Sequence, residues 1–105
     1  MKEKIVLLVI IAIAALAPHA SAADQFQIFV YDSDRNLVDG AYVEVWDGSI
    51  KADDGKTENG GVFDTWLERS IRYRIAAKRD NQEGEWNGFP ENSEIHIYMH
   101  IKVNA

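Results

Sequence analysis

The sequence contains no cysteine among its 105 residues. A chain without cysteine forms no disulfide, so its fold has to be held together by the apolar core alone. Roughly 80 residues can build one such core but not two, which predicts a single domain. The sequence also lacks an Asn-x-Ser/Thr site, an internal repeat and a low-complexity segment.

Basic side chains are scarce relative to acidic ones, with 11 Lys and Arg against 17 Asp and Glu and a formal net charge of −6. The few basic residues form no tract. A surface of this sign repels the phosphates of nucleic acids and the headgroups of acidic lipids. The composition therefore excludes DNA, RNA and acidic membranes as expected partners.

Only one long hydrophobic run is present, at residues 5–17. Two lysines precede it and a small-x-small sequence follows at residues 20–22, an order typical of a secretory signal peptide. The run would form about 20 Å of helix, shorter than the roughly 30 Å hydrocarbon core of a membrane. We expect a signal-peptide helix in residues 1–22 and a mature domain in residues 23–105, with no stable membrane span after cleavage; a retained anchor is the alternative.

The mature chain has no helical period of useful length, whereas alternation of apolar and polar residues recurs along it. Five segments alternate clearly, at residues 25–32, 41–46, 62–67, 71–78 and 95–103. A short edge strand is expected at 49–52, a turn at 53–55 and a polar loop at 80–94. The pattern predicts an all-β fold, a single small antiparallel β-sandwich of about 6–7 strands.

Turn residues flank the two central strands. Asp39-Gly40 precedes the first, and Asn59-Gly60-Gly61 precedes the second. Glycine accepts positive φ without a steric penalty, so both sites predict tight turns.

In the last strand, His96 and His100 are expected on one face about 13 Å apart, too far for one metal ion to bridge.

Candidate metal ligands occur in one turn, where Asp32, Asp34 and Asn36 alternate as in the first half of a calcium loop. The resemblance to that loop stops at Leu37, because the loop needs glycine there, and Val43 stands where it needs glutamate. We expect an ordinary hairpin turn and no cofactor, with a weak calcium site as the alternative.

The residues give no support for catalysis. Cysteine is absent, no serine, histidine and acid stand in a supporting context, and nothing singles out one acid pair among the many carboxylates. We expect the protein not to be an enzyme.

Aromatic residues are the best indication of function. Tyr42 and Trp46 share the expected solvent face of one strand, Trp66 lies on that of another, and Trp86 falls in the expected loop. Exposed flat rings suit a protein interface or a sugar-stacking platform, because they supply contact area at little cost in side-chain entropy. The same rings can also pack on loops and cross-strand neighbours with no binding role.

Several short motifs resemble the transthyretin-like and carboxypeptidase-regulatory-domain-like group of β-sandwiches. They are the turn and strand at residues 39–46, the "T-x-x-x-G-x-F" element formed by Thr57, Gly61 and Phe63, and the "Y-x-I" strand at residues 73–75. The resemblance implies the fold. It does not imply the hydroxyisourate-hydrolysing activity of one branch, because the early histidine and the terminal tyrosine-arginine-glycine-serine of that branch are missing.

These observations predict a secreted, periplasmic or cell-surface module without catalytic activity. Its expected partner is a protein or a cell-envelope polymer. A carbohydrate-binding module that uses the exposed tyrosine and tryptophans is the alternative, and a calcium-stabilised accessory domain is a third.

Overall fold

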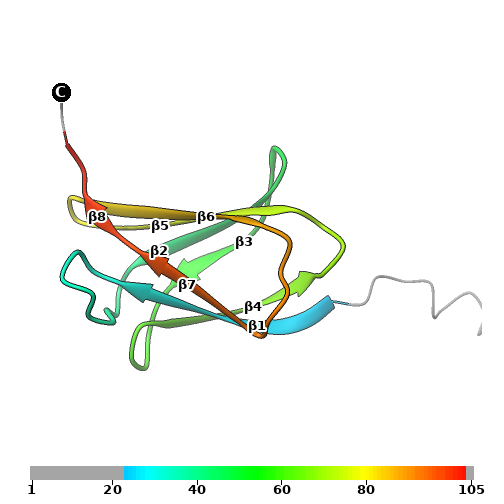
Figure 1. Cartoon of the computed structure of the whole chain (residues 1–105), viewed down its shortest axis with the longest axis horizontal. Helices are drawn as coiled ribbons and strands as arrows, with labels where there is room; N and C mark the ends of the chain where they lie inside the picture. Colours follow the sequence, from blue (N-terminus) through cyan, green and yellow to red (C-terminus); the bar gives the residue numbers. More distant parts are fainter. Residues whose placement is uncertain (1–22, 104–105) are drawn as a thin grey trace, which may run out of the picture.

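The computed structural model describes residues 23–103, and within this range the protein is all-β with no helix (Figure 1). The strands form a three-stranded sheet of order β4-β1-β7 and a five-stranded sheet of order β3-β2-β5-β6-β8. Their bounds are β1 Ala23–Tyr31, β2 Tyr42–Asp47, β3 Ile50–Lys56, β4 Val62–Glu68, β5 Tyr73–Arg79, β6 Gln82–Gly88, β7 Glu94–Tyr98 and β8 His100–Ile101.

The all-β prediction is confirmed, but several of its details need correction. The described residues form eight strands rather than six or seven. The edge strand β3 continues through the turn expected at 53–55. The expected loop at 80–94 contains strand β6, which pairs with β5 along its whole length.

The fold is not purely antiparallel. The first strand, β1, pairs in parallel with β7, in a register that places Phe29 opposite His96 and Tyr31 opposite Tyr98. Parallel neighbours require a long connection. Here that connection is most of the fold, because the chain builds β2 to β6 before β7 returns to the edge of the three-stranded sheet.

The alternation of side chains along the strands places one hydrophobic core between the two sheets. Phe26, Ile28 and Val30 from β1 are fully buried, as are Val43 and Val45 from β2. In β4 the inward face is the one that carries Thr65 and Leu67. Polar and aromatic residues at the intervening positions are left on the two outer faces.

The expected last strand is divided between the sheets. Residues up to Tyr98 belong to the three-stranded sheet, buried Met99 lies at the crossing, and β8 pairs with β6. Gly84 makes the crossing possible, since a Cβ there would lie 2.8 Å from the carbonyl oxygen of Tyr98. His96 and His100 therefore lie on opposite outer faces, and the prediction that they share a face is wrong.

The predicted turns at Gly40 and at Gly60-Gly61 are confirmed, with φ of 78°, 95° and 80°. Asp39 joins the two turns, because its Oδ1 accepts hydrogen bonds from the amides of Gly60 and Gly61 at 3.0 and 2.7 Å. Gly61 lies close to the backbone of Val38, and a Cβ at position 61 would lie 2.9 Å from the Val38 backbone nitrogen.

The expected signal peptide at residues 1–22 lies outside the described residues. Within residues 23–103, we find no helix with the length and apolar character needed to cross a membrane.

Candidate functional site

Tyr42 and Trp46 lie on the outer face of the five-stranded sheet, where both are half-buried. Cations cover their rings. The Lys78 ammonium is 5.5 Å from the Tyr42 ring centroid, and the Arg74 guanidinium carbon is 5.4 Å from that of Trp46. Both cations come from the neighbouring strand β5, in which Lys78 pairs with Tyr42 and Arg74 pairs with Trp46. The basic face of β5 thus serves these rings, and Arg74 also reaches Glu85 at 3.5 Å.

A polar cluster completes this face. The Tyr42 hydroxyl donates to Asp54 Oδ2 at 2.7 Å, and the Lys51 ammonium lies 2.8 Å from the same oxygen. The hydrogen bonds from Lys51 and Tyr42 hold the pKa of Asp54 below its ordinary value, and the hydrogen bond to Asp54 raises the pKa of Tyr42. These aromatic side chains are engaged with their own neighbours.

The other two tryptophans lie elsewhere. Trp66 is 66% exposed on the outer face of the three-stranded sheet. Trp86 is in β6 rather than in a loop, and it is half-buried against the hydrophobic core. The four predicted ligand-contact residues therefore do not form one surface. Tyr42 and Trp46 share one face, whereas Trp66 and Trp86 are each placed apart from that pair.

An aromatic cluster that the sequence analysis did not identify lies on the outer face of the three-stranded sheet. Phe29 and Tyr31 project from β1, and His96 and Tyr98 project from β7. Phe29 stacks on His96 with centroids 5.0 Å apart, and Tyr31 stacks on Tyr98 at 4.3 Å, with both pairs at 13° between planes. Tyr31 also stacks on His96 at 5.7 Å. We call these four residues the aromatic ladder.

Polar contacts fix the ladder. The Tyr31 hydroxyl and His96 Nδ1 are 2.8 Å apart, and His96 Nε2 is 3.2 Å from Glu94 Oε1. The pKa of the Tyr31 phenol is raised, mainly by burial and to a smaller extent by the neighbouring Tyr98. At the end of the ladder, the Arg35 guanidinium carbon lies 5.0 Å from the Tyr98 ring centroid. These contacts hold the rings of the ladder in one arrangement. The ladder also stays accessible to a partner, because Tyr98 is 48% exposed.

The strand register shows what surrounds the ladder. Val62 of β4 pairs with Phe29, completing one row of the sheet. The next row places Asp64, Gln27 and Glu94 side by side across β4, β1 and β7. Trp66 follows one row further, about 13 Å from Phe29 along the sheet. We call this whole outer face the ladder face.

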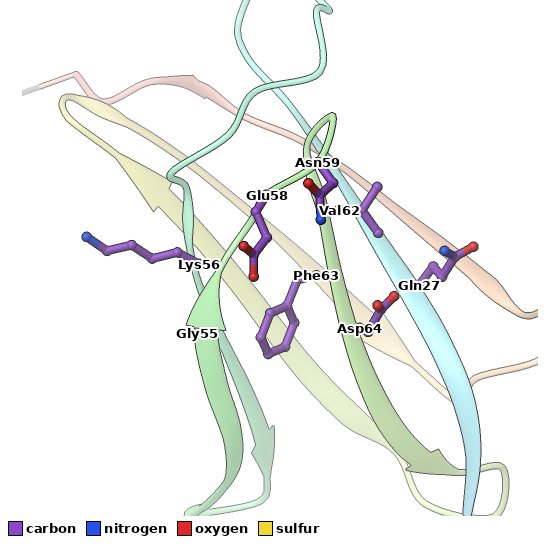
Figure 2. Close-up of a pocket in the computed structure, with 8 residues that line it drawn as sticks. All are labelled: Gln27, Gly55, Lys56, Glu58, Asn59, Val62, Phe63 and Asp64. Carbon is purple, nitrogen blue, oxygen red and sulfur yellow. The ribbon is translucent and has the colours of Figure 1, made fainter.

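The ladder face continues into a hollow of about 500 Å³ at the edge of β4 (Figure 2). Val62, Asp64 and Gln27 line it from the ladder face, and Glu58 and Gly55 are among the residues that line it from the side of β3. Figure 2 shows the Phe63 side chain between β3 and β4. Gly55 allows this position, because a Cβ there would lie 2.5 Å from the Phe63 ring.

The candidate calcium residues act within their own turn. Asp32 Oδ1 accepts hydrogen bonds from the amides of Asp34 and Asn36, each at 2.9 Å. The turn is closed by Arg35 in the left-handed region, with φ of 68°. Within residues 23–103 no three His, Cys, Asp or Glu side chains are grouped so that they could hold a metal ion.

No protein-family model matches the sequence, and no curated protein matches it either. The candidate site is defined by the geometry of this chain.

Proposed function

We propose that this protein is a secreted or cell-surface β-sandwich module of the transthyretin-like type, without catalytic activity, that binds another protein through its ladder face. The observation that carries the proposal is the aromatic ladder itself. Four rings from two neighbouring strands are stacked, hydrogen-bonded and partly open to solvent. Protein interfaces are enriched in aromatic side chains held in one conformation before binding, because little side-chain entropy is then lost.

The two sheets differ in a way that supports this choice. The outer face of the five-stranded sheet is covered by its own ion pairs and by cations over its rings. The edge strand β3 carries Lys51, Asp53, Asp54 and Lys56, a charged composition that discourages edge pairing. The ladder face instead presents Tyr98, Trp66 and Val62, and Val62 also lines the hollow at β4.

Site-specific photocrosslinking tests the proposal in the cells that produce the protein. A benzophenone side chain placed at Tyr98 is expected to crosslink to one discrete protein, whereas the same group at Trp46, on the outer face of the five-stranded sheet, is not. Mass spectrometry of the crosslinked band identifies the partner. Equal crosslinking at the two positions, or none at Tyr98, would refute the ladder face as the interface.

Carbohydrate binding is the second candidate, and it rests on Trp66. Each ladder ring has a face against another ring, which leaves less open ring surface for a sugar. Trp66 is exposed and pairs in the sheet with Gln25, a residue whose amide can hydrogen-bond to a sugar hydroxyl. A soluble glycan should then shift tryptophan fluorescence in the wild type but not in Trp66→Ala. Retention of the shift in that variant would exclude Trp66 as the sugar platform.

A further inference from the structure

The carboxylates on the ladder face define the chemistry of the partner. Asp64 and Glu94 are exposed, and they flank Gln27 in the row next to Phe29. Among the residues that the structure describes, neither has a lysine or arginine within 4.0 Å. Glu94 Oε1 lies 3.2 Å from Nε2 of the His96 ring.

Several cations of the described residues are engaged away from Asp64 and Glu94. Lys51 is paired with Asp54, Arg74 with Glu85 and Arg69 with Asp24. Lys78 lies over the Tyr42 ring. Lys56 lines the same hollow as Asp64, but its side chain extends away from Asp64 (Figure 2). The ladder face thus keeps two carboxylates, Asp64 and Glu94, that no lysine or arginine of the described residues pairs with.

One contact within the protein places a cation against the ladder. Arg35 lies over the ring of Tyr98 at one end of the ladder. A guanidinium over an aromatic ring is attracted by the negative ring face. Among the described residues no lysine or arginine lies over Phe29, which stacks on His96. Phe29 is also the end of the ladder beside Asp64 and Glu94.

From this charge complementarity, and resting on the proposed function, we propose that the ladder face binds an arginine- or lysine-bearing segment of another protein. One cation of the segment lies near Phe29, between Asp64 and Glu94. Arg35 occupies the equivalent position at Tyr98 from within the chain. The apolar surface of Val62 and the hollow at β4 receive the neighbouring side chains of the segment.

Binding of three labelled heptapeptides to the purified full chain tests this inference by fluorescence anisotropy. The peptides alternate valine with arginine, glutamine or glutamate, so that only charge differs. We expect the arginine peptide to bind about tenfold more tightly than the glutamine peptide and the glutamate peptide not to bind, with the preference reduced at high salt.

Two pairs of variants assign the effect to the ladder face. Asp64→Asn with Glu94→Gln should weaken the arginine peptide about tenfold, since each exposed ion pair contributes up to about fivefold. Asp80→Asn with Glu83→Gln removes the same charge from the other sheet and should change binding less than twofold. Arg35→Asn should tighten binding about threefold by opening the Tyr98 ring, whereas Arg72→Asn, with the same charge change, should not.

Equal binding of the three peptides, absence of binding by the arginine peptide, or equal losses in both carboxylate variants would overturn the inference. Crosslinking from Tyr98 is independent of these results. If it occurs while the arginine preference does not, the ladder face is an interface for a partner of different chemistry, and only the present inference fails.

Discussion

The buried hydroxyl of Thr57 ties the start of β2 to the end of β3, and its removal should destabilise the fold measurably. Thr57 is 2% exposed. Its Oγ1 accepts a hydrogen bond from the amide of Ala41 at 3.0 Å and donates one to the carbonyl of Val38 at 2.7 Å. The backbone of Thr57 also pairs with Ala41 and Gly40 at 2.9 and 2.8 Å. The hydroxyl therefore supplies both bonds at a point where water has little access.

Thr57→Val keeps the shape of the side chain but leaves a buried amide without a partner. An unpaired buried donor costs about 1–3 kcal/mol of unfolding free energy. For a domain of this size, that corresponds to a decrease in Tm of about 4–8 °C per kcal/mol. Thr57→Ser retains the hydroxyl and loses one methyl group, so it should lose only about 1 kcal/mol.

Urea unfolding followed by tryptophan fluorescence measures both variants. The midpoint should fall more for valine than for serine, with the m-value unchanged. If the valine variant is within about 0.5 kcal/mol of the wild type, or the serine variant is the less stable of the two, then the hydroxyl does not have the stabilising role that its contacts indicate.

Further predictions concern the strand crossing and the pH dependence of stability. Gly84→Ala should cost about 1–3 kcal/mol in the same urea experiment, because the new Cβ meets the backbone of β7; a neutral result would show that the crossing relaxes easily. The raised pKa of Tyr31 and of Tyr42 means that the native state holds these protons more tightly than the unfolded chain. Their contribution to the stability of the fold is full below about pH 10 and is lost as the pH rises through the pKa values of the folded state. An absorbance titration at 295 nm should show that Tyr31→Phe and Tyr42→Phe each remove one tyrosine that ionises at higher pH than an ordinary tyrosine. The lowered pKa of Asp54 has the opposite sign, so its contribution is present above about pH 4 and is lost as the pH falls through the folded pKa, a loss that Asp54→Asn should abolish.

Strand faces and turns could be predicted because they are local. Alternation predicted that Tyr42 and Trp46 lie on the outer side of β2, opposite its buried valines, and glycines identified the turns at Gly40 and Gly60. Strand β6 could not be recognised from its hydrophobic pattern, because Gly84 and Gly88 alternate with polar residues. Gly84 is small because β7 passes against it, which is a contact between residues distant in the sequence.

The aromatic ladder depends on pairing that local patterns do not specify. Phe29 and Tyr31 recur at a spacing of two in the first strand, as His96 and Tyr98 do in the last, and each pair alone reads as an ordinary solvent face. Only the parallel register of β1 and β7 brings them together. Strict alternation also continued through Met99, so it concealed the change of sheet that separates His96 from His100. The signal that the sequence offered for the ladder was the two pairs of outward rings, Phe29 with Tyr31 and His96 with Tyr98, in the first and last strands that it predicted.

The most direct test of the ladder face as a binding surface is a chemical-shift map. The ¹⁵N-labelled full chain is titrated with the arginine heptapeptide, and amide shifts are followed along every strand. We expect the largest shifts at Phe29, Tyr31, His96 and Tyr98 and at the β4 positions beside them, with β2 and β5 unchanged. Shifts concentrated on β2 and β5, or spread evenly over both sheets, would contradict the assignment of the ladder face as the binding surface.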